Sequence, residues 1–258
     1  ELVMPDFNRS TSLYLNKDVT TGVIKKLNLK FIEKNIKQRE LKIYLPFNYH
    51  NLSDLPCIYV FDGDDMLNFA NYQNILDNCI HYKKIEPLVA VFIPSHDRSD
   101  EYLNSKKSTF MNVLKTELVP EIERNYKVAK DPEKRALHGI SAGGYYALCS
   151  IFKHPDMFLK VAAQSSAIKS KLFKIFTDSL KNDGIPKTAK IYMDVGRFDL
   201  EVYKYDTPWI FIDINKKFRF ELQKYGINHK YRELNDGHSW GNWRERIEDI
   251  LIYLFSEK

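Results

Sequence analysis

Apolar and polar positions along the chain follow two different periods, and together they predict alternating strands and helices. Residues 22–32 and 38–45 carry apolar side chains at alternate positions around a polar turn, which predicts two paired strands. Short, wholly apolar runs indicate strands that are buried on both faces. The predicted strands cover residues 22–32, 38–45, 57–61, 88–93, 135–140, 159–164, 190–195 and 230–234.

Helical segments lie between the later strands. Asp64 and Asp65 are suited to cap a helix that reaches about residue 81, and Ser108 to cap one that ends near Tyr126. Strands that alternate with helices indicate an α/β fold, with a mostly parallel sheet covered on both faces. Further helices are predicted over residues 142–152, 168–182, 210–225 and 240–256.

The organisation of the chain is simple. Residues 1–20 show little periodicity and are expected to form an N-terminal arm. No linker rich in proline or glycine divides the remainder, so residues 21–258 are expected to form a single domain. The chain begins at Glu1 rather than at a methionine, so the sequence carries no information on a signal peptide.

Composition excludes several classes of protein. Hydrophobic residues make up 44% and charged residues 28% of the 258 residues, which excludes disorder as the main state. No apolar run approaches the roughly 18 residues of a membrane helix. The net charge of +5 arises within residues 22–42, where basic residues alternate with apolar ones; this pattern favours the solvated face of two strands over a nucleic-acid surface. Cys57, Cys79 and Cys149 form no CxxC pair, which favours buried thiols in a reducing, cytoplasmic compartment.

A serine motif stands where a predicted strand gives way to a predicted helix. It reads Gly139-Ile-Ser141-Ala-Gly143. A sharp strand-to-helix turn raises a serine hydroxyl above a sheet, and small flanking residues permit the strained backbone. The N-terminus of the new helix points free N–H groups at a developing oxyanion. Ser141 is therefore the candidate nucleophile, and a tight structural turn is the alternative.

A nucleophilic serine needs a base and an acid that orients the base. His238 lies in the turn after the last strand, at the carboxyl edge of the sheet, whereas His229 stands at the opposite end of that strand. For the acid we favour Asp199, in the loop after strand 190–195. Glu201 is a spare candidate, Asp194 is expected inside the strand, and Asp236 is expected to shape the turn before His238.

Two backbone N–H groups are expected to bind the oxyanion. One belongs to Ala142, directly after the serine. The other is expected from Phe61-Asp-Gly63-Asp64, where a glycine lets the backbone approach the reacting carbonyl, so Asp64 is the second candidate. Its carboxylate should point away from the oxyanion site. A plain turn is the alternative for this segment.

A set of short segments follows in a fixed order along the chain, from about residue 22 to residue 256. They are Tyr44-Leu-Pro46, Tyr59-Val-Phe-Asp-Gly63, Arg98-Ser-Asp-Glu101-Tyr102, Glu117–Tyr126, Gly139-Ile-Ser-Ala-Gly-Gly144, Gly196-x-x-Asp199 and Gly237-His-Ser-Trp-Gly-Asn-Trp-Arg244. In these segments, and in its N-terminal antiparallel strand pair, the chain resembles the putative-esterase family of α/β-hydrolases, which includes enterochelin esterases, related siderophore trilactone hydrolases and feruloyl esterases.

This resemblance implies a serine carboxylic-ester hydrolase whose substrate is a siderophore trilactone, with or without iron. Because a ferric catecholate is anionic, Arg98 and Arg197 are candidates for substrate contact. For Arg98 a local salt bridge with Glu101 or Asp100 is the alternative, and for Arg197 a solvated loop charge. Trp240 is a candidate for the pocket wall, with packing beneath the histidine loop as its alternative.

Other functions stay open at this stage. A feruloyl, acetyl or other small-ester hydrolase uses the same residues, and so does an acyltransferase. A catalytically silent hydrolase fold that only binds a ligand is the alternative from another class. No cofactor and no metal site are expected, since HExxH, CxxC pairs and nucleotide-binding glycine motifs are all missing from the sequence. The expected partner is a small-molecule ester, with no nucleic acid and no membrane span; the oligomeric state is left open.

Overall fold

The centre of the protein is one eight-stranded sheet. The computed structural model describes residues 9–181, 184–204 and 207–256. Within them the strand order is β1-β2-β4-β3-β5-β6-β7-β10, and only the β1–β2 and β2–β4 neighbours are antiparallel. The strands are β1 (Val23–Leu29), β2 (Arg39–Leu45), β3 (Cys57–Phe61), β4 (Val89–Ile93), β5 (Arg135–Ile140), β6 (Lys160–Gln164), β7 (Lys190–Phe198) and β10 (His229–Gly237). This arrangement confirms the predicted mostly parallel sheet with an antiparallel pair at its N-terminal edge.

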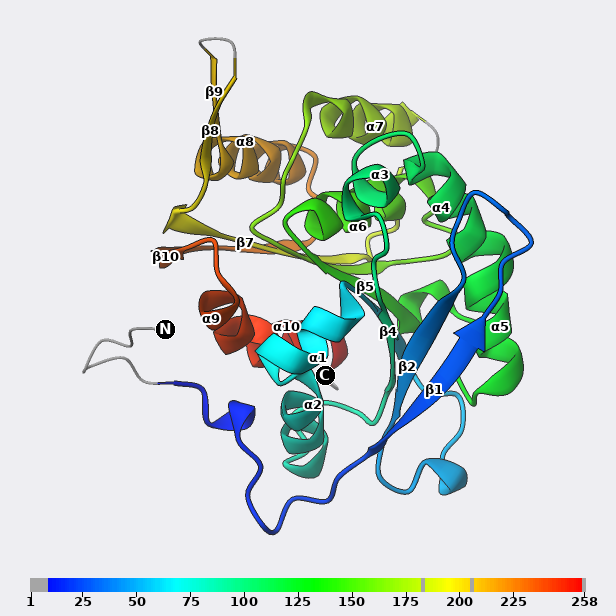
Figure 1. Cartoon of the computed structure of the whole chain (residues 1–258). Helices are drawn as coiled ribbons and strands as arrows, with labels where there is room; N and C mark the ends of the chain where they lie inside the picture. Colours follow the sequence, from blue (N-terminus) through cyan, green and yellow to red (C-terminus); the bar gives the residue numbers. More distant parts are fainter. Residues whose placement is uncertain (1–8, 182–183, 205–206, 257–258) are drawn as a thin grey trace.

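Helices cover both faces of the sheet (Figure 1). One face packs against α3 (Arg98–Tyr102), α4 (Lys107–Val113), α5 (Val119–Asn125), α6 (Ala142–Lys153), α7 (Ser170–Lys181) and α8 (Phe211–Lys224). The other packs against α1 (Gly63–Ala70), α2 (Tyr72–His81) and α10 (Ile247–Phe255). The side chains of β3 point alternately into the two layers, with Tyr59 in one apolar core and Ile58 in the other. The all-apolar sequence of β3 follows from this burial on both faces.

Several helices differ from the prediction. The helix expected to reach residue 81 is interrupted at Asn71, whose φ of +51° ends α1 and precedes α2. Asparagine tolerates this left-handed conformation. The helix expected to be capped by Ser108 instead begins at Lys107, and a π-helical turn, Leu114–Leu118 (η3), separates α4 from α5. The predicted C-terminal helix is divided into α9 (Trp240–Trp243), a 3-10 turn, Arg244–Arg246 (η5), and α10.

A short hairpin occupies a segment for which the sequence predicted only a loop. Its strands are β8 (Glu201–Lys204) and β9 (Thr207–Ile210), and they pair antiparallel to each other as a separate sheet. The hairpin extends away from the main sheet beside α8 (Figure 1). The remaining 3-10 turns are Thr11–Leu13 (η1), Tyr49–Asn51 (η2) and Pro132–Lys134 (η4).

The N-terminal arm packs against the helical layer that contains α2. Residues 1–8 of the predicted arm lie outside the described residues. Leu13 is only 1% exposed, and the Asn78 amide on α2 donates to the carbonyl oxygens of Ser12 and Tyr14 at 2.9 Å. The described part of the arm is therefore held to the body of the protein by hydrogen bonds from a side-chain amide to its main-chain carbonyls.

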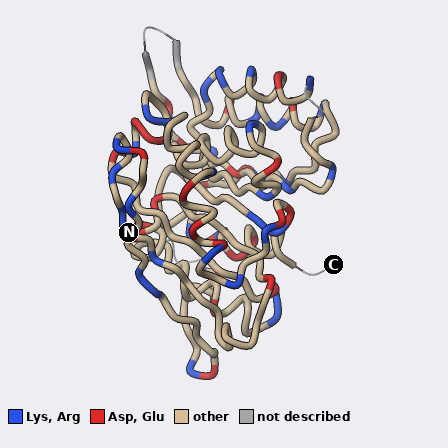
Figure 2. The backbone as a smooth tube through the Cα atoms, turned by 90° about the vertical axis from the view of Figure 1, so that its right-hand side faces the viewer, with Lys and Arg blue, Asp and Glu red and all other residues tan. Residues whose placement is uncertain are grey.

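Charges are interspersed over the chain, as Figure 2 shows for basic and acidic residues. On β1 the basic side chains face solvent, and Lys26 pairs with Glu40 of β2 at 2.9 Å. The three cysteines are free and buried, and burial raises the pKa of Cys57 and of Cys79 to about 12. Among the described helices, none has the length and apolar character needed to cross a bilayer.

Candidate active site

The carboxyl ends of the parallel strands meet at one edge of the sheet, and the predicted site residues follow them there. Ser141 comes directly after β5, Asp199 after β7 and His238 after β10. His229 starts β10 at the opposite edge, where its Nδ1 lies 2.7 Å from the Ile227 carbonyl oxygen. Of the two histidines, His238 therefore lies on the serine's side of the sheet.

Ser141 occupies a strained turn. Its φ of +56° and ψ of −114° are unusual for a residue with a side chain. Backbone hydrogen bonds hold it: its N–H donates to Gln164 O at 2.8 Å, and its carbonyl accepts from Tyr145 N and Ala167 N at 3.0 Å. A Cβ at Gly139 would overlap the backbone of Gly143, so the turn needs that glycine. These features agree with the strand-to-helix turn predicted from the serine motif.

His238 and Asp199 form a direct pair. His238 Nδ1 lies 2.6 Å from Asp199 Oδ1, with the histidine side chain 17% exposed and the carboxylate 1% exposed. Burial alone would raise the pKa of Asp199, but the hydrogen bonds with His238 and Ser165 and the Leu200 N–H hold it below its ordinary value. The carboxylate therefore stays ionised at neutral pH and fixes the proton of the imidazole on Nδ1.

Aromatic residues and a buried serine support this pair. The His238 ring meets the rings of Phe211 and Trp243 edge-on, with centroids 5.3 and 4.7 Å away. Trp243 Nε1 donates to Ser165 Oγ at 2.9 Å, and Ser165 has a φ of +43°. Sequence reasoning did not single out Ser165. The sequence feature that could have identified it is the polar pair Ser165-Ser166, which directly follows a buried strand at the edge where Ser141 lies.

Within the described residues, no hydrogen bond joins the Ser141 hydroxyl to His238. Resting enzymes often form this contact only when substrate binds. The structure therefore brings the histidine and the acid together and places the serine at the same edge.

The two candidate oxyanion donors lie at helix N-termini. Asp64 is in the first turn of α1, and Ala142 is the first residue of α6. N–H groups in a first helical turn have no acceptor within the helix, and the helix dipole adds positive potential there. The Asp64 carboxylate pairs with Lys42 Nζ at 2.7 Å. It is therefore engaged by β2, as expected of a carboxylate that turns away from an oxyanion.

Arg98 connects the two segments that carry these donors. Its Nε donates to Asp62 Oδ2 and its Nη2 to Ile140 O, both at 3.0 Å. Asp62 precedes α1, and Ile140 directly precedes Ser141. The sequence suggested Glu101 or Asp100 as the local partner of Arg98. This prediction is wrong, because Arg98 pairs with Asp62 and Glu101 pairs with Arg39 at 2.7 Å. The salt bridge of Arg98 instead spans 36 residues.

Arg197 and Trp240, the other two candidates for substrate contact, each contact neighbouring side chains. Arg197 lies within β7 rather than in a loop, and its Nη1 donates to Asn235 Oδ1 at 2.9 Å. Trp240 packs between Phe69 and Trp243, with ring centroids 5.8 and 5.3 Å away. The contacts with substrate predicted for these two residues stay predictions.

Three further residues occupy structural positions. His138 is fully buried between the Tyr72 hydroxyl at 2.9 Å and the Gln164 side chain at 3.1 Å, and burial lowers its pKa to about 4. Asp194 lies inside β7, as predicted, and Arg244 Nε is 3.8 Å from Glu245 Oε1. In the part of the chain that the structure describes, no group of three His, Cys, Asp or Glu side chains is arranged to hold a metal ion.

Sequence comparison matches residues 35–254 to the esterase family described as putative esterase. The chain is 28% identical over 181 residues to the uncharacterized protein YbbA of Bacillus subtilis (strain 168), covering 64% of this chain and 70% of that protein. It is 25% identical over 204 residues to an acetyl esterase of Caldicellulosiruptor saccharolyticus, covering 64% and 71% of the two chains.

Solved structures share the fold. The enterobactin esterase from Shigella flexneri has a TM-score of 0.77 at 18% identity, over 98% of this chain and 64% of that one. A ferulic acid esterase has a TM-score of 0.72 at 18% identity, over 92% and 99% of the two chains. At these identities the likeness establishes an α/β-hydrolase architecture, whereas the family match covers most of the chain. The protein therefore belongs to the putative-esterase family and is a carboxylic ester hydrolase.

Proposed function

We propose that the protein hydrolyses esters with a triad of Ser141, His238 and Asp199. The observation that carries this proposal is the 2.6 Å contact of His238 Nδ1 with a buried Asp199 carboxylate, at the sheet edge where Ser141 occupies its strained turn. With Nδ1 engaged by Asp199, the imidazole presents its unprotonated Nε2 to the serine.

The reaction has two halves. Ser141 Oγ attacks the ester carbonyl carbon while His238 Nε2 takes the hydroxyl proton, and Asp199 stabilises the imidazolium that forms. The tetrahedral intermediate collapses, the alkoxide leaves with the proton from His238, and an acyl-enzyme remains. Water, deprotonated by His238, then attacks the acyl carbon and releases the acid and free Ser141. Interception by an alcohol instead of water would give acyl transfer.

The backbone N–H groups of Asp64 and Ala142 are proposed to bind the oxyanion in both halves. Support comes from their positions in the first turns of α1 and α6, where each N–H lacks a helical acceptor. Arg98 ties Asp62 to Ile140 and so fixes the separation of these two donors.

Replacing Arg98 by methionine is expected to lower kcat about 10- to 100-fold with a smaller change in KM, because a displaced oxyanion donor weakens binding of the transition state more than that of the substrate. Steady-state kinetics on a soluble p-nitrophenyl ester measure both constants. Lys106→Met is the control: Lys106 is a nearby cation, and its pairing with Asp97 at 3.2 Å is partly exposed. A raised KM at unchanged kcat would instead assign Arg98 to substrate contact.

The proposed substrate is a siderophore trilactone. Support comes from the likeness to the enterobactin esterase fold, at a TM-score of 0.77. Arg197 lies two residues before Asp199 and is exposed, so its guanidinium is available to an anionic catecholate group.

A second candidate is an acetyl or feruloyl ester of a carbohydrate. Relatives detected by sequence favour it, namely the acetyl esterase and a xylanase/feruloyl esterase of Xylanibacter ruminicola that is 26% identical over 155 residues, 55% of this chain and 21% of that protein. The triad chemistry is the same for both candidates, and only the groups around the scissile ester differ.

The test is to incubate the protein with apo and ferric catecholate trilactones, and in parallel with acetylated and feruloylated oligosaccharides. Mass spectrometry then detects linear trilactone products or released acids, with Ser141→Ala as control. Serine-dependent ring opening supports the siderophore substrate, and the ratio of apo to ferric turnover reports a role in iron release. Release of acetate or ferulate with intact trilactone would replace the first candidate by the second.

A further inference from the structure

An irregularity in β10 sets the position of His238. Leu234 pairs with Gly196 of β7, but the next pair is Gly237 with Phe198. Two residues of β10, Asn235 and Asp236, therefore oppose the single residue Arg197. This is a β-bulge, and bulges bend a strand and redirect the side chains that follow. His238 comes directly after this bulge and meets Asp199, which comes directly after β7.

The bulge lies against a glycine of the neighbouring strand. A Cβ at Gly196 would overlap the carbonyl oxygen of Asp236 and lie 2.7 Å from its Oδ1. Asp236 thus occupies the space that any side chain at Gly196 would need. The missing side chain at Gly196 lets the Asp236 carboxylate lie under the bulge, on the side of the C-terminal helices.

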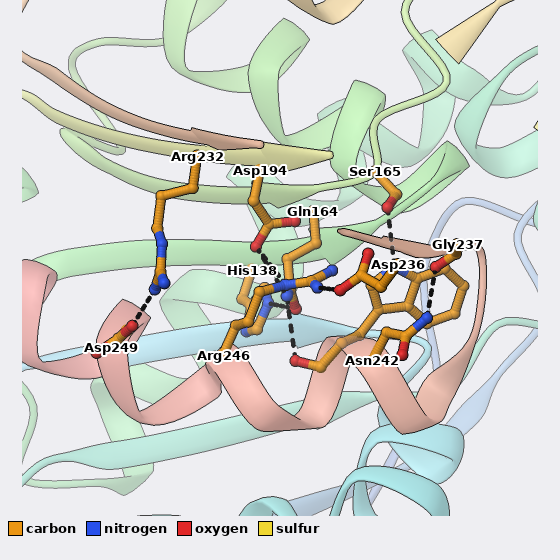
Figure 3. A network of polar contacts seen from close by, with 11 residues as sticks. His138, Gln164, Ser165, Asp194, Arg232, Asp236, Gly237, Asn242, Arg246 and Asp249 are labelled. Atoms are coloured by element: carbon orange, nitrogen blue, oxygen red, sulfur yellow. Dashed lines mark hydrogen bonds and ion pairs between the residues drawn. The ribbon is translucent and has the colours of Figure 1, made fainter. Parts of the chain in front are cut away.

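Arg246 holds that carboxylate. Its Nη1 donates to Asp236 Oδ2, and its Nε donates to Asp194 Oδ2 at 3.0 Å (Figure 3). The Arg246 side chain is 4% exposed and that of Asp194 is fully buried within β7, where Gln164 Nε2 also donates to it at 3.1 Å. The guanidinium therefore joins the irregular end of β10 to a fixed point in the middle of the sheet.

Burying this ion cluster costs desolvation free energy. The Asp194 carboxylate and the Arg246 guanidinium are almost wholly removed from water, and the Asp236 side chain is 19% exposed. Desolvation of buried ions can exceed the attraction between them. Stability alone is thus a weak explanation for the cluster. Its location suggests another explanation. Asp236, at one end of the cluster, is two residues from His238, and Asp194, at the other end, lies on β7, which Asp199 directly follows.

We propose that Arg246 is a positioning residue, which fixes the bulge through Asp236 and thereby holds the His238 imidazole against Asp199. This inference rests on the proposed triad. The guanidinium touches neither substrate nor the reacting atoms. It acts through Asp236, and its loss should misplace the general base without altering the binding of the ester.

A second arginine–carboxylate pair between β10 and the C-terminal helices provides a matched control. Arg232 of β10 pairs with Asp249 of α10, and Figure 3 shows this pair to one side of the Arg246 cluster. Its side chains are 37% and 47% exposed, and it lies before the bulge. Asp236→Asn and Asp249→Asn therefore each remove one carboxylate charge from an ion pair between β10 and the C-terminal helices. Only Asp236 is connected to His238, through the bulge.

The experiment compares kcat, KM and melting temperature of Asp236→Asn, Asp249→Asn, Arg246→Met and Arg246→Lys in the full chain. We expect Asp236→Asn to lower kcat about 10- to 100-fold with KM within about two-fold, and Asp249→Asn to leave kcat within about two-fold. Arg246→Lys should recover part of the activity lost in Arg246→Met. If Arg246→Met does not fold, Asp236→Asn carries the test, since it leaves the Arg246–Asp194 pair in place.

Unchanged kcat in Asp236→Asn, or an equal loss in both Asp→Asn variants, would overturn the inference and leave the proposed function intact. Wild-type protein without ester hydrolysis would overturn the proposed function instead. In that case proton NMR decides the inference: the downfield resonance of the His238 Nδ1 proton should disappear in Asp236→Asn and persist in Asp249→Asn. A resonance that persists in both variants would contradict the positioning role.

Discussion

Replacing Ser141 by alanine is expected to lower kcat for ester hydrolysis by at least about 10^4-fold, because no other group in the proposed mechanism can form the acyl-enzyme. The variant should fold normally. The hydrogen bonds that hold the turn use the backbone N–H and carbonyl of Ser141, which alanine keeps. Initial rates on a p-nitrophenyl ester and intact-mass detection of fluorophosphonate labelling measure the effect.

Ser166→Ala is the matched control for this experiment. Ser166 is a buried serine near the same edge, and its hydroxyl oxygen has no hydrogen-bond partner among the described residues. Its activity and its labelling should stay close to those of the wild type. Folded wild-type protein that takes up no fluorophosphonate would identify the chain as a hydrolase fold without a reactive serine.

Asp199→Asn is expected to lower kcat about 10^3- to 10^4-fold. An amide can donate to His238 Nδ1, which favours the tautomer that carries its proton on Nε2 and cannot accept the serine proton. The same change should remove a pH-dependent contribution to stability. Because the folded pKa of Asp199 lies below its unfolded value, this contribution is present above about pH 4 and is lost as the pH falls through the folded pKa. Kinetics at pH 7 and thermal melts between pH 3 and 7 test both effects.

Glu201→Gln distinguishes the two acids that the sequence proposed. Glu201 lies on β8 and is exposed, whereas Asp199 is in contact with His238. We expect activity within about two-fold of the wild type for Glu201→Gln. A large loss in that variant, together with an active Asp199→Asn, would transfer the role of the acid to Glu201.

The sheet and the edge that carries the site could be predicted because both depend on local patterns. A strand buried on both faces, such as β3, must be apolar throughout, and parallel strands necessarily end at one edge. Because Ser141, Asp199 and His238 each follow a parallel strand, the sequence predicted that all three lie at the same edge.

Features that depend on single conformations or distant contacts could not be predicted in the same way. The helical pattern continues through Asn71, although one left-handed residue divides α1 from α2. Arg98 carries no sign in the sequence that its partner is Asp62, 36 residues earlier, rather than Glu101. Likewise, the bulge at Asp236 depends on Gly196 in another strand, and only the folded sheet brings the two together.

The three buried thiols are distributed over three different layers of the fold. Cys57 lies on β3 in the sheet, Cys79 on α2 beneath it and Cys149 on α6, the helix that begins after Ser141. A thiol shielded in this way reacts with an alkylating reagent only while its surroundings are open. The three thiols are therefore intrinsic reporters of local unfolding. The alkylation rate of Cys149 reports how often α6 opens, and α6 is the helix that begins directly after Ser141.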